Sequence, residues 1–271
     1  MRTTVFLCPE CKEQFKPRME VMPNMRSDWR TCASCGQRVD ITKLIEDRPI
    51  HATRGYLGGQ PYPYPISYVP LGTFSGTNST GAVTIATVSV PATCALVACM
   101  ATDITAGDLD ANSLKWNGTT LTSRSSTTFG TAGQVSIYSL SNNNPGSGTF
   151  AFVATAITIP SWSITLFALT NSGTQSRSGA ALGTDTTPNS GLTSLPTITD
   201  TEMLVGAVAF ENTANSGNWN EGYTEGQFSA GATYSVNDGY KGMRVRGKFS
   251  AGKNGCTSNN WGASICTFRL R

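Results

Sequence analysis

Residues 134–169 read QVSIYSLSNNNPGSGTFAFVATAITIPSWSITLFAL, and this stretch decides the fold of the chain. Apolar and small polar residues alternate over 134–140, and compact apolar runs follow at 149–159 and 162–169. The segment NNNPGSG at 142–148 is rich in residues that form turns. Short apolar runs separated by turns are typical of antiparallel β-strands, so this stretch predicts strands joined by hairpins.

The same pattern continues on both sides and predicts the remaining strands. They are AVTIATVSV, ALVACMA, SLKW, MLVGAVAF, GMRVRGKF and ASICTFRL, at 82–90, 95–101, 113–116, 203–210, 242–249 and 263–270. Turn residues separate these runs, as NG at 117–118, NSG at 171–173 and NDG at 237–239. We therefore expect residues 73–271 to form an all-β domain, a jelly-roll-like antiparallel β-sandwich of about eight strands in two sheets.

Charge is sparse and unevenly placed. Charged residues are 14% of the 271-residue chain, well below the usual quarter. The net charge is +3, and residues 1–54 carry the whole excess, with ten Lys/Arg against seven Asp/Glu. The neutral body lacks the basic footprint of a nucleic-acid-binding protein. The start, MRTTVFLCPEC, has only a short apolar run. We expect no export signal, no membrane partner and synthesis in a cytosol.

Four cysteines near the start, Cys8, Cys11, Cys32 and Cys35, have the spacing of a zinc site. In a C-x2-C pair, one tight turn aims both sulfurs at one ion, and two such pairs complete a tetrahedral shell. Two disulfides or a redox pair are the alternatives, but they need an oxidising compartment or a neighbouring βαβ pattern. Four sulfur ligands leave no open position, so the expected Zn²⁺ is structural. Residues 5 to about 40 resemble a zinc ribbon, a module that often binds nucleic acid or protein, and we assign residues 1–45 to this head.

Residues 46–72 have the composition of a linker. The run GYLGGQPYPYPISYVPLG at 55–72 contains four prolines, which predict an extended arm rather than a helix or a central strand. Its four tyrosines would otherwise be exposed, so we expect them to pack on the body or on a neighbouring subunit, with the neighbour favoured: Tyr56, Tyr62, Tyr64 and Tyr68. The single histidine, His51, is expected at the surface or in packing rather than on the metal.

The body shows a resemblance that its strands carry. The segments WNGTTLT at 116–122, IYSL at 137–140 with NPGSGTF at 144–150, and EMLVGAVAFEN at 202–212 are its most recognisable parts. Together they are similar to a β-sandwich module of phage virion proteins and of bacterial surface proteins, loosely over residues 83–271. These motifs mark strands and hairpins, so the resemblance implies a fold more than a site. The loop at 175–191 and the basic segment at 241–253 depart from it.

Four body cysteines, Cys94, Cys99, Cys256 and Cys266, lack metal-site spacing. We expect buried free thiols, with a Cys256–Cys266 disulfide as the alternative. The segment TDITAGDLDAN offers a weak Ca²⁺ loop, at Asp103, Asp108 and Asp110, but a polar strand connection is favoured. A basic segment is expected to be a solvated face first and a protein-docking face second: Lys241, Arg244, Arg246, Lys248 and Lys253.

The sequence holds no catalytic constellation that we recognise, so we expect no enzyme. One histidine outside the body rules out a Ser-His-Asp arrangement within it. Glu221 and Glu225 are candidates for a glycosidase pair, but their spacing along the chain does not set the separation that such a pair requires. Three aromatic side chains, Trp219, Tyr223 and Trp261, are the candidates for a glycan-binding platform, although packing is favoured.

These observations predict a structural protein of a tailed-phage virion, most consistent with capsid decoration or the tail. Such a protein is made in the host cytoplasm, where thiols stay reduced, and then works in the particle. We expect the zinc-ribbon head and the arm to anchor it to major capsid or tail proteins, within a symmetric homo-oligomeric assembly. The alternatives are a surface adhesin that binds glycans and a zinc-ribbon protein that binds nucleic acid, which the neutral body disfavours.

Overall fold

The computed structural model describes residues 6–7, 14–15, 29–31, 38–40, 66–103, 114–142, 145–193, 202–211, 217–220, 222–243, 247–257 and 259–270. The chain divides into two compact units, Met1–Tyr62 and Pro63–Arg271. The boundary between them lies within the segment predicted as a linker. Among the described residues, no helix is long and apolar enough to cross a membrane.

The first unit contains two small antiparallel pairs of strands. Strand β1 (Phe6–Leu7) pairs with β2 (Gln14–Phe15), and β3 (Trp29–Thr31) pairs with β4 (Arg38–Asp40). In the sequence, Cys8 and Cys11 fall between β1 and β2, and Cys32 and Cys35 fall between β3 and β4. Each C-x2-C pair is therefore bracketed in the sequence by two strands that pair with each other.

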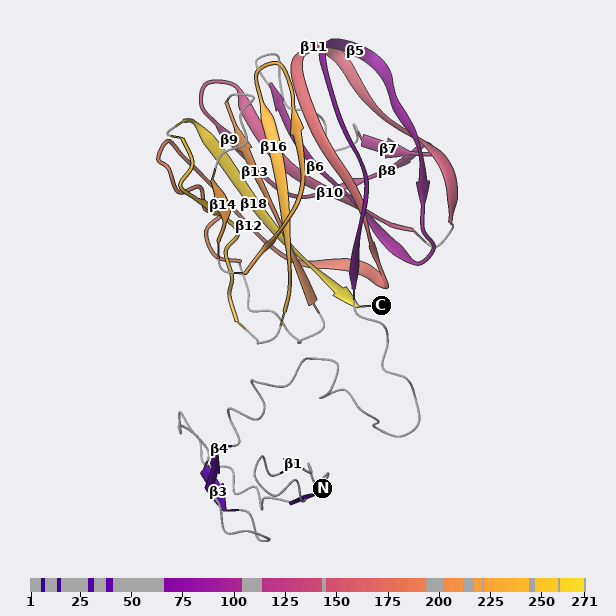
Figure 1. Cartoon of the computed structure of the whole chain (residues 1–271). Coiled ribbons are helices and arrows are strands. Elements are labelled where there is room, and N and C mark those ends of the chain that lie inside the picture. The colour runs from indigo at the N-terminus through magenta and orange to yellow at the C-terminus, as the bar shows by residue number, and fades with distance from the viewer. Residues whose placement is uncertain are drawn as a thin grey trace. The chain divides into compact units, whose positions relative to one another are not determined.

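The first half of the second unit forms one antiparallel sheet (Figure 1). Its strands are β5 (Ser67–Val90), β6 (Cys94–Asp103), β7 (Leu114–Trp116), β8 (Thr119–Thr120), β9 (Thr122–Phe129), β10 (Gly133–Asn142) and β11 (Gly146–Thr170). They lie in the order β8-β7-β11-β6-β10-β9, and β5 follows β11 along nearly its whole length. The predicted turn at 117–118 is confirmed, since Asn117 and Gly118 have positive φ angles of 49° and 75° between β7 and β8.

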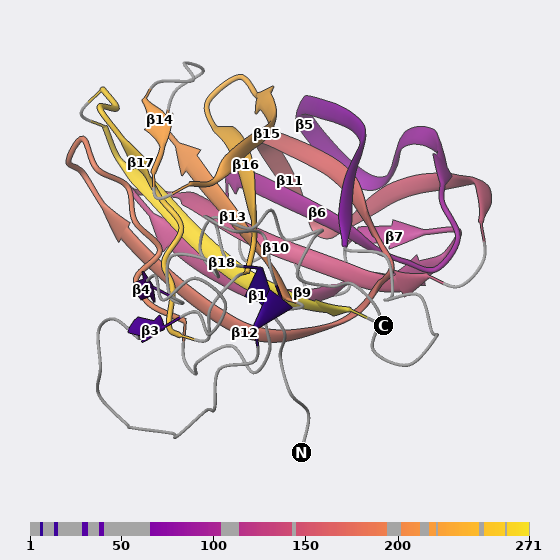
Figure 2. The same cartoon turned by 60° about the horizontal axis from the view of Figure 1, so that its bottom comes forward.

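The second half forms a second antiparallel sheet, which Figure 2 shows from β12 to β15. Its strands are β12 (Ser172–Gly183), β13 (Glu202–Phe210), β15 (Thr224–Ala230), β16 (Ser235–Gly242) and β18 (Trp261–Leu270), in the order β12-β18-β13-β16-β15. A further pair, β14 (Asn218–Trp219) with β17 (Lys253–Asn254), stands apart from this sheet. Each sheet thus comes from one contiguous part of the chain. The all-β sandwich is as predicted, while this strand order does not establish jelly-roll connectivity.

The central strands β6 and β13 are buried on both of their faces. Towards the other sheet, Val97 and Cys99 of β6 pack in one core with Val205 and Ala207 of β13. On its outer face, β6 presents Leu96, Ala98 and Met100 to side chains of the paired strands β5 and β11, and together these residues form a second core. This double burial explains why 95–101 and 203–210 are continuous apolar runs instead of alternating ones.

The outer face of the second sheet has its own apolar cover. Leu204 packs with Tyr223, Met243 and Ala251, and a neighbouring cluster joins Val208 to Trp261. The covering residues come from the segments that connect strands, so this layer depends on contacts between distant parts of the chain. Each fully buried Leu or Val contributes about 1.5–3 kcal/mol through its transfer from water.

Side chains also tie the edges of the two sheets together. The Ser125 hydroxyl of β9 donates a hydrogen bond to the Gly179 carbonyl of β12 (2.9 Å). At the other edge, the Ser229 hydroxyl of β15 donates to the Phe74 carbonyl of β5 (2.8 Å). Pro70 lies in β5, where the register to β11 shifts and where β11 is the only ladder partner of β5 among the described strands. An edge strand at a bulge is where proline is tolerated, because its missing N–H is not needed there.

Three predictions are wrong in position: the end of the linker, one strand and one turn. Strand β5 begins at Ser67, so 67–72 is strand rather than linker. Of the predicted strand at 242–249, only Gly242 lies in a strand among the described residues, because β16 ends there. The NDG segment at 237–239 lies within β16 and is fully buried at Asn237 and Asp238, so it is not a turn. In addition, the polar strands β9, β12 and β15 carry too little apolar alternation for the sequence to have predicted them.

Candidate functional site

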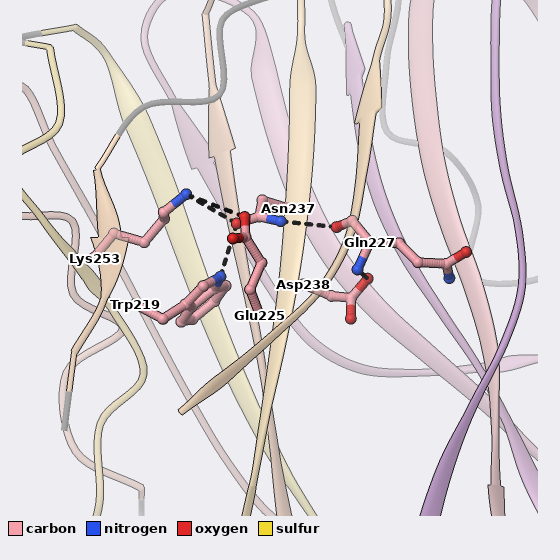
Figure 3. Close-up of polar contacts among 6 residues, drawn as sticks. All are labelled: Trp219, Glu225, Gln227, Asn237, Asp238 and Lys253. Atoms are coloured by element: carbon pink, nitrogen blue, oxygen red, sulfur yellow. Dashed lines mark hydrogen bonds and ion pairs between the residues drawn. The ribbon is translucent and has the colours of Figure 1, made fainter. Parts of the chain in front are cut away.

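A buried polar cluster surrounds the NDG segment of β16 (Figure 3). Asn237 and Asp238 are both completely buried, and alternation along the strand sends their side chains to opposite faces of the sheet. Buried polar groups carry a large desolvation cost unless they are hydrogen-bonded. The partners of these two side chains therefore explain why a turn-like tripeptide is stable inside a sheet.

A β-bulge in the edge strand β15 supplies the first partners. Glu225 is opposite Gly239 and Phe228 is opposite Asn237, so β15 carries one extra residue between them. The main chain of Gln227 at this bulge is bound by side chains of β16. Asn237 Nδ2 donates to the Gln227 carbonyl (2.8 Å), and the Gln227 N–H donates to Asp238 Oδ1 (3.1 Å). The two side chains thus replace ladder hydrogen bonds that the bulge removes.

On the outer face, Asn237 Oδ1 accepts two further hydrogen bonds. Trp219 Nε1 donates at 2.7 Å and Lys253 Nζ donates at 2.9 Å. Trp219 and Lys253 are register partners in the β14–β17 pair, which brings both side chains to the same amide. Lys253 Nζ also lies 3.9 Å from Glu225 Oε1, and the side chain of Lys253 is 0% exposed while that of Glu225 is 51% exposed. Burial lowers the pKa of Lys253, and the nearby carboxylate of Glu225 opposes this effect.

Two glycines make room for the Trp219 ring. Gly206 of β13 and Gly239 of β16 are register partners on adjacent strands. A Cβ on Gly239 would lie 2.6 Å from ring carbons of Trp219, and one on Gly206 would lie 3.0 Å from the same ring. The ring also stacks on Tyr223, with 5.6 Å between centroids. The indole N–H is therefore held against Asn237 by packing on both sides.

On the inner face, Asp238 binds Tyr68, which the sequence had placed in the arm. The Tyr68 hydroxyl donates to Asp238 Oδ2 (2.9 Å). The Tyr68 ring stacks between Phe167 and Tyr240, at 4.6 and 4.4 Å between centroids. Tyr68 thus packs on its own domain. Burial raises the pKa of Asp238 to about 6, although the hydrogen bonds from Tyr68 and from the Gln227 amide lower it.

The other predicted site residues lie partly outside and partly inside the ranges that the structure describes. Several lie outside the described residues: Cys8, Cys11, Cys32, Cys35, His51, Tyr56, Tyr62, Tyr64, Asp108, Asp110, Glu221, Arg244 and Arg246. Among the residues that the structure does describe, no group of three or more His, Cys, Asp or Glu side chains could hold a metal ion.

The basic segment is not one solvated face where the structure describes it. Lys248 is exposed, and the ammonium of Lys241 lies 5.6 Å from the centroid of the Tyr223 ring, a cation–π distance. Lys253, in contrast, is fully buried in the cluster. Expecting Lys253 to be solvated was therefore wrong, because a residue pattern along the chain does not show that β17 pairs with β14 and that the Lys253 side chain binds Asn237.

The aromatic and cysteine predictions are settled by burial. Tyr223 and Trp261 are buried, and Trp219 is half-buried, so packing is the confirmed role of these rings. Cys94, Cys99, Cys256 and Cys266 are all buried thiols that form no disulfide, as we favoured. Cys256 and Cys266 do not pair because Cys256 faces the outer cluster of the second sheet, whereas Cys266 faces the core between the sheets.

Comparison with protein-family models, with curated proteins and with solved structures finds no match for this chain. The function must therefore be argued from the residues themselves. The sequence reasoning missed Asn237, Asp238 and Gln227 entirely. No local signal in the sequence marks Asn237 and Asp238, because NDG is a common turn sequence and their side-chain partners come from distant segments of the chain.

Proposed function

We propose that this chain is a structural protein of a tailed-phage virion, decorating the capsid or forming part of the tail. The observation that carries the proposal is the way the sandwich is closed. Both outer faces are covered by apolar layers, and both sheet edges are tied by side chains. A domain built in this manner suits a passive, exposed module, and its low charge fits the same role.

The head is proposed to be a zinc ribbon that anchors the domain to major capsid or tail proteins. Its support is the position of the cysteines, since each C-x2-C pair falls between two strands that pair with each other. Cys8, Cys11, Cys32 and Cys35 would hold one structural Zn²⁺ as four thiolates. The arm would complete the anchor, and the copies would form a homo-oligomer within a symmetric assembly. The jelly-roll connectivity belongs to the same proposal.

The competing functions have less support. A glycan-binding adhesin would need exposed aromatic platforms, and the rings we considered for it, Trp219, Tyr223 and Trp261, pack against the sheet. A zinc-ribbon protein that binds nucleic acid is disfavoured by the neutral body. A catalytic role is not proposed, because Asn237, Asp238 and Lys253 of the polar cluster are buried and leave no room for a substrate.

Mass spectrometry of purified virions tests the proposal directly. We expect this chain among the stoichiometric structural proteins of the particle, and its absence from particles would contradict the proposed function. Metal analysis tests the head separately. We expect about one zinc per chain, lost in the fourfold Cys→Ser variant, because four thiolates form one site. A matched control replaces the four buried body cysteines, whose loss should leave the zinc content unchanged.

A further inference from the structure

Lys253, Asn237 and Glu225 bring an amine, a carboxamide and a carboxylate together on the outer face of the second sheet (Figure 3). Lys253 Nζ is 2.9 Å from Asn237 Oδ1. Because a C=O bond is about 1.2 Å long, the nitrogen is within roughly 4 Å of the carbonyl carbon Cγ. Neither Lys253 nor Asn237 has exposed surface, so no water competes for this contact. A small movement would bring the two atoms to reacting distance.

We propose that Lys253 and Asn237 become joined by an amide bond between Nζ and Cγ, formed by the folded protein itself. Glu225 is the proton acceptor, and the indole N–H of Trp219 stabilises the carbonyl oxygen. The bond is an intramolecular isopeptide cross-link between β16 and β17. It is independent of the proposed virion role and of the zinc head, since all four residues belong to the second unit.

The amine must lose its proton before it can attack. Burial lowers the pKa of Lys253, which favours the neutral amine inside the protein. Glu225 lies 3.9 Å away and is half exposed, so it can take a proton from the ammonium and exchange protons with water. Desolvated lysine nucleophiles are activated in this manner.

The carbonyl oxygen is already held where negative charge would develop. Trp219 Nε1 donates to Asn237 Oδ1 at 2.7 Å, which is the distance of donors that stabilise an oxyanion. The ring is fixed on Gly206 and Gly239, so the donor is in place before reaction. Asn237 Nδ2 donates to the Gln227 carbonyl at 2.8 Å, which orients the carboxamide and sets which atom leaves.

The proposed step balances without any co-reactant. The Lys253 ammonium gives one proton to Glu225, and the neutral amine attacks Cγ of Asn237. The Nζ–Cγ bond forms while the carbonyl electron pair moves onto Oδ1. When the carbonyl re-forms, the Cγ–Nδ2 bond breaks, and Nδ2 takes a second proton from Nζ to leave as ammonia. The proton on Glu225 departs with the ammonia as ammonium, which restores the carboxylate.

The first test is mass spectrometry of the purified full-length protein. We expect a mass lower than that of the sequence by one ammonia, because the bond expels Nδ2. Trypsin should then yield a branched species that joins residues 178–241 to residues 249–269, uncut at Lys253. A chain whose mass equals its sequence, with cleavage at Lys253, would overturn the proposal. An ammonia loss found only in linear peptides, such as one containing Asn254–Gly255, would overturn it as well.

Three variants assign the roles. Glu225→Gln keeps the shape of a half-exposed side chain, so we expect it to fold, to keep its full mass and to be cut at Lys253. If this variant folds and still loses ammonia, Glu225 is not the proton acceptor. Lys253→Arg removes the nucleophile and should also retain the full mass. Lys248→Arg, at an exposed lysine five positions away, is the matched control and should lose ammonia as the wild type does. Folding of each variant is checked by near-ultraviolet circular dichroism.

Discussion

Asn237 and Asp238, neighbours at the centre of β16, are both buried polar residues, but their side chains find their partners on opposite faces of the sheet. Asn237 points outward and is surrounded by a buried amine, an indole N–H and a nearby carboxylate. Asp238 points inward and is bound by a tyrosine hydroxyl and a backbone amide between two apolar sheets. The outer face brings an amine, a carboxamide and a carboxylate together, whereas the inner face holds one carboxyl group whose pKa is raised to about 6. One strand can thus carry a buried polar side chain on each face, provided that each is hydrogen-bonded. We call the contacts of Asn237 the outer tie and those of Asp238 the inner tie.

The largest expected effect comes from removing the outer tie. Asn237→Ala removes the group that contacts both the buried Lys253 nitrogen and the Trp219 N–H, and with it the proposed cross-link. Breaking a buried polar network in this way costs about 3–5 kcal/mol. We expect a lower urea midpoint of unfolding with an unchanged slope. Asn254→Ala, at an exposed asparagine next to Lys253, is the control and should be nearly neutral. Equal losses of stability in both variants would mean that the contacts of Asn237 stabilise the fold no more than an exposed asparagine does.

The inner tie should make stability depend on pH. The pKa of Asp238 is about 6 in the folded protein and about 3.8 when unfolded. The folded state therefore holds its proton more tightly, so the contribution of Asp238 is fully present below about pH 4 and is lost as the pH rises through about 6. A difference of about two pKa units corresponds to about 3 kcal/mol. Urea unfolding at pH 4 and pH 7 measures it, and Asp238→Asn should flatten this part of the profile. A variant profile that matches the wild type would contradict the assignment.

Gly226→Ala should separate the inner pair. A Cβ at position 226 would overlap Asp238 Oδ2 and would lie 2.8 Å from the Tyr68 hydroxyl, so the bulge of β15 or the Asp238 side chain must shift. Overpacking of this kind costs about 1–3 kcal/mol. Thermal unfolding should show a lower Tm, because the added methyl group overlaps the buried Asp238 carboxyl group. Gly222→Ala tests the opposite case, since Gly222 has space around it and only its positive φ of 74° opposes a side chain.

The smallest effect is expected from Tyr68→Phe, which keeps both ring contacts and removes only the hydroxyl. Loss of one hydrogen bond costs about 1 kcal/mol. Because the bond from Tyr68 lowers the pKa of Asp238, the variant should move the pH profile of unfolding towards higher pH. A shift to lower pH would show that the tyrosine does not stabilise the carboxylate. Tyr240→Phe, which keeps the stacked ring on the same face, is the control.

The difference between the predicted and observed elements follows from the range of the forces involved. The apolar runs at 95–101, 149–159 and 203–210 predicted strands correctly, because burial of one run hardly depends on which partner covers it. The NDG segment was misassigned because its residues favour turns in isolation. Its strand conformation is supported by the bulge at Gln227 and by Trp219 and Lys253, up to 18 residues away. No local pattern records those partners.

Composition and periodicity alone predicted an all-β body and a separate cysteine-bearing head, and they favoured buried thiols over a Cys256–Cys266 disulfide in the body. These features depend on hydrophobicity, spacing and turn propensity, which each segment carries within itself. Only the tertiary structure decided that Tyr68 belongs to the body, that Lys253 is buried and that Asn237 and Asp238 face opposite layers. Such polar placements depend on desolvation and on partners from distant strands, and these exist only once the two sheets have closed on each other.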